Sequence, residues 1–295
     1  MSGKLKEVRT RIGSVKNTQQ ITKAMKVVSA AKLRKAQDAI LRMRPYSVKM
    51  TEILGNLAAA VKDDMSIPQA EVRPIKKVLM VAVTSDRGLC GGFNSNVTKR
   101  IKAVIAASYT EQAAAGNVHV MPVGKKADDM FKRLDYPLLS GFAGLMGKVT
   151  FEPSKAASDH LKQVFAAGEY DRIDIVYNAF KNAATQDLTV EQFLPIKPPV
   201  DDDGSQSNID FLFEPDRETM VEELVPRILD TQFFRCLLDS NAAEHGARMT
   251  AMEQATENAN EILKELKISY NRARQAAITT ELTEIVSGAA ALSEG

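Results

Sequence analysis

The 295-residue chain has no tryptophan, two cysteines and three histidines, and these shortages exclude several kinds of site. Cys90 and Cys236 lie far apart without CxxC spacing, so the sequence predicts neither a disulfide framework nor a zinc site. His119, His160 and His245 show no spacing typical of a catalytic triad or a metal site. We therefore expect no catalytic residues, no metal and no cofactor.

Long apolar runs are also missing. No stretch approaches the ~18 residues that a transmembrane helix requires. The N-terminal sequence MSGKLKEVRT has no apolar core of a signal peptide. With 44% hydrophobic and 26% charged residues the composition is ordinary for a soluble protein. The sequence predicts a soluble, unexported chain without membrane insertion.

The stretch 227–295 contains no proline and carries a helical apolar stripe. Its apolar positions recur three or four residues apart, as one face of a helix requires. They are Met252, Ala255, Ala259, Ile262, Leu266, Tyr270, Ala273 and Ala277, followed by Ile278, Leu282, Ile285, Ala289 and Leu292. At 1.5 Å per residue this stretch would form a rod of roughly 100 Å, which needs a partner helix.

The partner is predicted at the other end of the chain, over residues 5–58, as an amphipathic helix of about 80 Å. Pro45 should kink this helix or mark a local irregularity. The apolar or small positions of its stripe are Leu5, Val8, Ile12, Val15, Thr18, Ile21, Met25, Val28, Ala36, Ile40 and Met43.

Both predicted helices adjoin the same middle part of the chain, so they must run antiparallel with the two termini at one tip. The C-terminal helix is the longer, and about 30 Å of it should project beyond the N-terminus. An exposed apolar helix end normally means a binding surface. The residues concerned are Ile285, Val286, Ala289, Ala290, Ala291 and Leu292.

Strands and helices alternate in the middle of the chain, which indicates an α/β layered domain. Strands are predicted at 77–84, 118–123, 173–180 and 188–194, and helices at 95–115, 125–134 and 153–167. The predicted fold class is α/β, with a long antiparallel α-helical coiled coil formed by the two terminal helices and a Rossmann-like α/β domain inserted between them. The predicted boundaries are 1–60 for the first helix, 61–76 for a linker, 77–210 for the α/β domain and 211–295 for the last helix.

A glycine-rich turn, SDRGLCGGFN at 85–94, follows the first strand and precedes a helix, an arrangement that can bind phosphate. The turn lacks the Lys-Ser/Thr of a P-loop and does not match G-x-G-x-x-G, which argues against a nucleotide site. We expect its glycines to supply positive φ angles and Cys90 to be a small turn residue rather than a nucleophile. The glycines are Gly88, Gly91 and Gly92, and the candidate helix caps are Asn94 and Ser95.

Charge is distributed unevenly along the chain. Residues 1–50 carry thirteen Lys or Arg against Glu7 and Asp38, a balance of +11, so the remainder must carry −9 to reach the total of +2. The two interpretations are a solvated helix face and a basic stripe that faces an acidic partner. Nucleic acid is one such partner, although the stretch has little aromatic interleaving and no recognised nucleic-acid motif.

Four segments together resemble the gamma subunit family of the F-type ATP synthase, in order and from end to end. They are ITKAMKVVSAAKLRKAQ, TSDRGLCGGFN, FLFEPD, and ARMTAM followed by YNRARQAAITTELTEIVSGAAAL. The resemblance implies a non-catalytic central shaft that turns inside a hexamer of three alpha and three beta subunits. It also implies an epsilon subunit and a membrane ring of c subunits as partners. The alternative is a basic coiled coil that binds nucleic acid.

The resemblance further implies roles for particular residues. Positions that match family residues contacting beta or supporting the shaft are Met25, Cys90, Arg248, Arg274, Gln275, Thr279 and Glu281. Positions that match the foot near epsilon and the c-ring are Phe211, Phe213 and Glu214. The cysteine pair of thiol-regulated chloroplast members is missing, so no redox switching of that kind is predicted. Without a transit peptide, we expect a bacterial protein at the cytoplasmic face of the inner membrane, bound there peripherally; the alternative is a processed organellar chain.

Overall fold

A computed structural model describes residues 2–60, 68–196 and 217–293, and its two terminal helices far exceed the others in length. The chain divides into two compact units, Met1–Ser29 with Met249–Gly295 and Ala30–Arg248, which are described separately below. The elements are α1 (Ser2–Ala60), η1 (Pro68–Ala70), β1 (Val78–Val83), α2 (Phe93–Ser108), α3 (Thr110–Ala114), β2 (Val118–Val123), α4 (Lys125–Arg133), η2 (Leu145–Gly147), α5 (Phe151–Ala166), β3 (Arg172–Phe180), β4 (Gln186–Leu194) and α6 (Arg217–Ser293).

The second unit is built on a four-stranded sheet with the order β2-β1-β3-β4. Strands β2, β1 and β3 are parallel, and β4 pairs antiparallel with β3. Every residue of the central strand β1 is buried, which explains its unbroken apolar sequence VLMVAV. The prediction of an α/β fold of Rossmann-like type with these four strands is confirmed.

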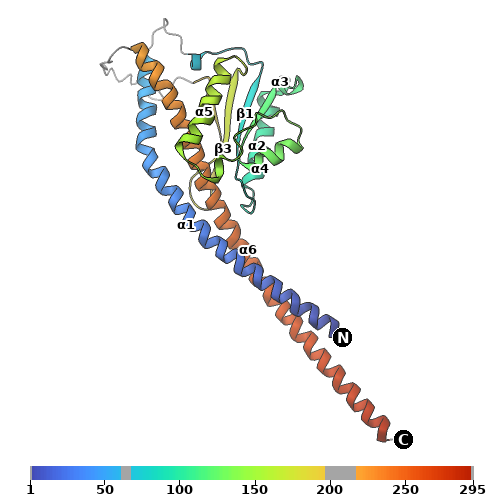
Figure 1. Cartoon of the computed structure of the whole chain (residues 1–295). Coiled ribbons are helices and arrows are strands. Elements are labelled where there is room, and N and C mark those ends of the chain that lie inside the picture. Colours follow the sequence, from blue (N-terminus) through green and yellow to red (C-terminus); the bar gives the residue numbers. More distant parts are fainter. Residues whose placement is uncertain (1, 61–67, 197–216, 294–295) are drawn as a thin grey trace. The chain divides into compact units, whose positions relative to one another are not determined.

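Each face of the sheet is covered by different helices, because successive side chains of a strand point to opposite faces. Leu79 of β1 packs in a core shared with α5 and the first part of α6, including Leu161 and Phe233. Met80, its neighbour, packs in a second core with α2 and α4, including Phe131. Figure 1 shows α5 on one side of the strands and α2 and α4 on the other.

The helix predicted at 95–115 is interrupted in the structure. Tyr109 separates α2 from α3 with φ −135° and ψ 33°. Its hydroxyl donates a hydrogen bond of 2.6 Å to the buried carboxylate of Asp174 in β3. Burial first, and Asp174 second, raise the pKa of Tyr109, so the hydroxyl stays protonated and can donate. Because the aromatic side chain turns into the core, the helix breaks at this residue.

The predicted caps of α2 are wrong. The helix begins at Phe93, and Gly92 occupies the cap position without a side-chain hydrogen bond to the helix. Asn94 lies inside the first turn, and its side-chain oxygen instead accepts from the backbone N–H (2.9 Å) and hydroxyl (3.0 Å) of Ser85. The amide of Asn94 therefore fastens the end of β1 to α2.

The rod expected over residues 227–295 is part of a longer helix. Helix α6 begins at Arg217 and contains Pro226. The carbonyl oxygen of Pro226 lies 3.4 Å from Nζ of Lys162 in α5, which also pairs with Asp230 at 2.7 Å. These contacts fix the turn that follows the proline against α5. Likewise α1 is a single helix that contains Pro45.

The first unit consists of the paired parts of α1 and α6. Side-chain hydrogen bonds join Gln19 to Asn260 and Thr22 to Thr256, so residue numbers rise on one helix as they fall on the other. The predicted antiparallel pair is therefore confirmed. In the α6 stripe opposite α1, Met252 and Ala259 are buried and the other residues are half-buried, except Ile262, which was assigned wrongly because it is 42% exposed. In the α1 stripe, Thr18, Ile21 and Val28 were assigned wrongly, because they are exposed in this unit.

Gly124 offers a test of the sheet's packing, because an added Cβ would lie 2.2 Å from the carbonyl oxygen of Thr84 and φ is +109°. We expect Gly124→Ala to lower the free energy of unfolding by more than about 3 kcal/mol. The matched control is Gly116→Ala, where φ is +72° and nothing lies within 4 Å, with an expected loss of about 1 kcal/mol from strain. Denaturant unfolding of the full chain measures both, and equal losses would contradict the packing argument.

Candidate functional site

The turn between β1 and α2 is tightly tied together. The hydroxyl of Ser85 donates to the carbonyl oxygen of Arg87 at 2.6 Å. Positive φ angles occur at Gly91 (60°) and at Leu89 (63°). The expectation of positive φ is thus confirmed at Gly91 only, since Gly92 has φ −79° and the second left-handed residue is a leucine.

The start of α4, which contacts the same turn, is not built to receive phosphate. A phosphate site needs free backbone N–H groups at a helix N-terminus. In α4 the N–H groups of residues 125, 126 and 127 instead donate to Asp86 Oδ1 (3.0 Å), the Ser85 carbonyl (3.1 Å) and Thr84 Oγ1 (2.8 Å). The carboxylate of Asp86 at this position would also repel an anion. These contacts favour the expectation that the glycine-rich turn has a structural role.

Cys90 lies inside the turn with its side chain buried against Phe93 and Ala243. Burial raises the pKa of its thiol above the usual value, which disfavours the nucleophilic thiolate. A side-chain contact between Cys90 and another subunit would require the turn to open. The neighbouring Leu89 is 65% exposed, so the outer surface of the turn is formed by other residues.

Arg248 connects this turn to α6. It is 9% exposed and pairs with Glu244 one turn earlier, at 2.5 Å. Its Nη2 donates to the carbonyl oxygens of Arg87 (3.1 Å) and Gly88 (3.3 Å). Because a guanidinium presents several donors in a fixed plane, one side chain can hold the turn and the carboxylate together. This geometry favours a supporting role for Arg248.

Burial dominates the electrostatics around Arg248. It raises the pKa of Glu244, although Arg248 opposes the shift. Burial also lowers the pKa of His245 to about 4, helped by the positive charges of Arg248 and Lys32. His245 is therefore neutral at pH 7. The group contains a base, which is half-buried, and an acid, which is buried.

Four of the remaining predicted residues lie exposed on α6 in the first unit. Arg274 and Glu281 are seven residues apart and share one line along the helix. Gln275 and Thr279 are four apart and share the adjacent line, where the Thr279 hydroxyl donates to the Gln275 carbonyl at 3.0 Å. Met25, on α1, is half-buried. The four α6 residues thus form a polar surface available for contact.

The C-terminal part of α6 is apolar and exposed. The paired residues of α1 and α6 have numbers that add up to 278 or 279, which sets Ser2 level with residue 276 or 277. Residues 278–293 then extend beyond α1 by about 24 Å. Within this extension Ile285 and Val286 are 67% and 66% exposed. The predicted apolar overhang is confirmed, slightly shorter than expected; of its six residues, the side chains of Ala290, Ala291 and Leu292 are not described.

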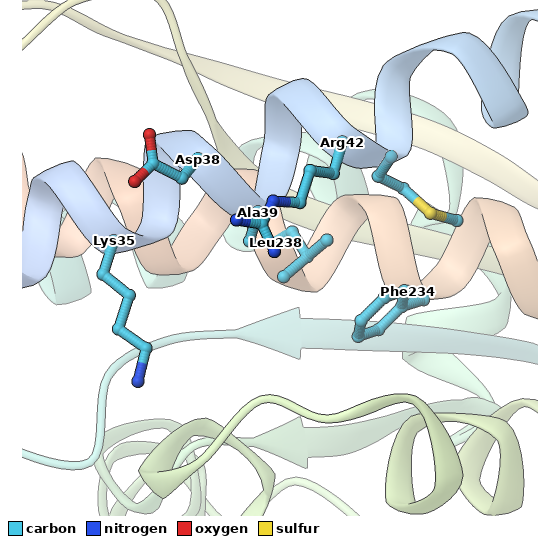
Figure 2. Close-up of a pocket in the computed structure, with 7 residues that line it drawn as sticks. Lys35, Asp38, Ala39, Arg42, Phe234 and Leu238 are labelled. Atoms are coloured by element: carbon cyan, nitrogen blue, oxygen red, sulfur yellow. The ribbon is translucent and has the colours of Figure 1, made fainter.

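The sequence did not predict a groove between α1 and α6 in the second unit. It has a volume of about 420 Å³ and is lined by Lys35, Asp38, Ala39, Arg42, Met43, Phe234 and Leu238. Figure 2 shows Phe234 and Leu238 on α6 and Lys35, Asp38, Ala39 and Arg42 on α1, with Lys35 extending to a lower level than Phe234. The lining combines apolar side chains with three charged ones, and it contains no serine, cysteine or histidine.

The predicted foot, metal sites and membrane-spanning helices can be considered only for the residues that the structure describes. Phe211, Phe213 and Glu214, the predicted foot, are not among the described residues. The described part of the chain holds no group of three His, Cys, Asp or Glu side chains that could bind a metal. Among the helices that the structure describes, none is long and apolar enough to cross a membrane.

The pairing of Arg248 with Glu244 can be tested by removing the cation. We expect Arg248→Leu to lower the free energy of unfolding at pH 7.5 by about 3 to 5 kcal/mol, because a buried carboxylate loses its partner. Without Arg248 the pKa of Glu244 rises further. A carboxyl group with a raised pKa in the folded state lowers the free energy of unfolding at a pH where it is ionised in the unfolded state, and this cost disappears as the pH falls. The loss should therefore shrink at pH 5.

Urea unfolding at the two pH values measures this effect. The double variant Arg248→Leu/Glu244→Leu is the control, since it removes both charges and should recover most of the loss at pH 7.5. A loss in the single variant that does not depend on pH would show that Glu244 is not the group left unpaired.

Comparisons with known proteins add the family. The ATP synthase family model matches residues 4–292. The ATP synthase gamma chain of Cytophaga hutchinsonii is 49% identical over 290 residues and that of Flavobacterium johnsoniae is 50% identical over 288, each comparison covering 98% of both chains. These relatives give no support to a nucleic-acid-binding protein.

Solved structures agree in fold. A chain of the Euglena gracilis mitochondrial ATP synthase, OSCP/F1/c-ring in rotational state 3, matches with a TM-score of 0.71 and 23% identity, covering 99% of this chain and 95% of that one. A central stalk/c-ring structure from Tetrahymena thermophila matches with a TM-score of 0.57 and 25% identity, covering 80% and 99%. With a helix pair, a β-sheet unit and relatives over the full length, the chain belongs to the family of ATP synthase gamma chains.

Proposed function

We propose that this chain is the central shaft of a rotary ATP synthase, which couples rotation of an ion-driven membrane ring to ATP synthesis or hydrolysis on other subunits. The observation that carries the proposal is the antiparallel pair of α1 and α6 with its exposed apolar end, in a chain that matches gamma chains along 98% of its length. The proposed domain division remains 1–60, 61–76, 77–210 and 211–295.

The proposed partners are three alpha and three beta subunits, the epsilon subunit and the c-ring. Support comes from the related solved structures, which are a central stalk with its c-ring and an OSCP/F1/c-ring assembly. The balance of +11 in residues 1–50 suits acidic segments of a partner. An apolar sleeve around the end of α6 would cover Ile285 and Val286 with few directional contacts, so rotation would break few hydrogen bonds.

A shaft must transmit torque, and α6 is attached to the sheet through half-buried polar contacts. Glu191 of β4 accepts hydrogen bonds from Arg235 (2.7 and 2.9 Å), Gln232 (2.6 Å) and Tyr177 (2.9 Å). Burial raises the pKa of Tyr177, which keeps its hydroxyl a donor. The Glu191 carboxylate resists displacement of α6 along the sheet, because a shift breaks several of these hydrogen bonds at once.

In this mechanism the chain contributes stiffness, shape and charge while the chemistry takes place on beta. The two helices are unequal in length and in charge, so each orientation of the shaft gives the three beta sites different surroundings and different nucleotide affinities. We propose that the chain itself is non-catalytic. We also propose that it acts peripherally at the cytoplasmic face of a bacterial inner membrane.

The first test is the native mass and MgATPase rate of the complex formed when this chain is co-expressed with alpha and beta subunits from the same genome. We expect one copy of the chain per three alpha and three beta subunits, ATPase activity in the complex and none in the isolated chain. Failure to assemble with folded partners would contradict the shaft, and turnover by the isolated chain would contradict the non-catalytic role.

A second test shortens the apolar end. Chains that end at residue 289, 285 or 281 should assemble with stepwise lower yield and torque, because each removes more of the surface proposed to sit in the sleeve. Yield on gel filtration and the ATPase rate measure the effect, and Ile285→Ala/Val286→Ala at full length controls for chain length. Complete loss of ATP binding to beta in the chain that ends at residue 289, the smallest deletion, would mean that the chemistry has been placed on the wrong subunit.

A further inference from the structure

Three successive polar contacts cross the helix pair in the first unit. Gln19 Nε2 lies 2.5 Å from Asn260 Oδ1, the hydroxyls of Thr22 and Thr256 lie 2.7 Å apart, and Lys26 forms an ion pair with Glu253. We call these six residues the polar seam. They occupy consecutive turns on both helices, where two long amphipathic helices ordinarily present apolar side chains to each other.

The orientation of α1 shows that the polar seam faces inward at the expense of apolar residues. Thr22 and Ser29 are buried, at 8% and 3% exposure, while Ile21 and Val28 are 60% and 54% exposed. Hydrophobic burial alone would favour turning α1 so that Ile21 and Val28 face α6. A feature other than apolar contact therefore sets the rotation of α1 in this segment.

The two threonine hydroxyls bond to each other and to their own helices. Thr22 Oγ1 lies 3.0 Å from the Gln19 carbonyl oxygen, and Thr256 Oγ1 lies 2.7 Å from the Met252 carbonyl oxygen. Each hydroxyl has one proton, so one of them donates back to its own helix and the other donates across the pair. The contact across the pair forms only where the two threonines lie level, so it favours this alignment of the helices.

The apolar positions of α6 discriminate poorly between alignments, because Ala255, Ala259, Ala273 and Ala277 present similar small side chains. The polar seam discriminates better. A slip of α6 by one turn in one direction would set Thr22 and Lys26 opposite Met252 and Met249. A slip in the other direction would set Gln19 opposite Lys264, Thr22 opposite Asn260 and Lys26 opposite Glu257, which exchanges the hydrogen bonds of Gln19 and Thr22 for others. Only the observed alignment pairs the two threonine hydroxyls with each other.

We propose that the polar seam sets the register of the helix pair and thereby positions Met25 of α1 relative to the polar surface of α6 at residues 274–281. Its members act as positioning residues, since a slip of one turn would move that surface by about 5.4 Å along α1. The register of the helix pair is a property of this chain alone. Its effect on the coupling of rotation to ATP chemistry rests on the proposed function.

Cysteine pairs in the full-length chain report the register. Ile12→Cys with Leu266→Cys matches the observed alignment, because the two numbers add up to 278 like those of Thr22 and Thr256. Ile12→Cys with Ile262→Cys, and Ile12→Cys with Tyr270→Cys, report slips of one turn in either direction. With the natural polar seam we expect oxidative crosslinking of the first pair alone.

The seam is then made apolar with Gln19→Leu, Thr22→Val, Thr256→Val and Asn260→Leu. We expect the slipped pairs to crosslink at least threefold more, without a lower thermal unfolding midpoint, because the added apolar contact offsets the lost hydrogen bonds. The matched control Thr22→Ser/Thr256→Ser keeps both hydroxyls and should retain the native crosslink. An unchanged crosslinking pattern in the apolar seam would overturn the proposal and show that the register is set elsewhere in the chain.

The assembled complex supplies a second measurement. We expect the apolar seam to lower the number of ions pumped per ATP hydrolysed in membrane vesicles at least twofold, which a seam serving stability alone would not do. Altered crosslinks with unchanged pumping per ATP would overturn the positioning role. Failure of the natural chain to assemble would instead contradict the proposed function and leave the crosslinking result to decide the register.

Discussion

One continuous helix, α6, must bury its surface against two different kinds of neighbour. Around residues 225–237 it closes the core on one face of the sheet, where Phe233 and Leu237 are fully buried. Around residues 252–277 it packs against the single helix α1, which covers only one narrow face. The broad apolar surface of the first segment and the Ala-rich stripe of the second follow from that difference.

Where α6 meets the sheet unit, charged side chains are buried or half-buried with their partners. Lys162 with Asp230 and Glu244 with Arg248 are buried pairs, and Glu191 with Arg235 is a half-buried pair. Such pairs add little net stability over apolar packing, but each tolerates only one placement of the helix. For a chain proposed to carry torque, resistance to sliding is a more useful property than additional stability.

The glycine-rich turn shows how a motif can be conspicuous for structural reasons. Its positive φ angles at Leu89 and Gly91, and its carbonyl oxygens aimed at Arg248, adapt the end of β1 to the passing helix. The N–H groups at the start of α4 are already used by the chain itself. The fold resembles nucleotide-binding α/β domains, while Asp86 and Ser85 of this turn accept from N–H groups at the start of α4 that would otherwise be free for phosphate.

The sequence by itself determined the strands, the antiparallel helix pair and the apolar end at Ile285, because these depend on periodicity and length, which are local properties of a chain. Only the tertiary structure decided that Cys90 is buried, that Tyr109 breaks a helix to reach Asp174, and that Ile21 faces outward while Thr22 faces inward. Those outcomes depend on partners distant in sequence, such as Ala243 and Thr256. A hydrogen bond to a residue distant in sequence can outweigh the tendency of a segment to bury its apolar side chains. The sequence of that segment alone does not reveal such a bond.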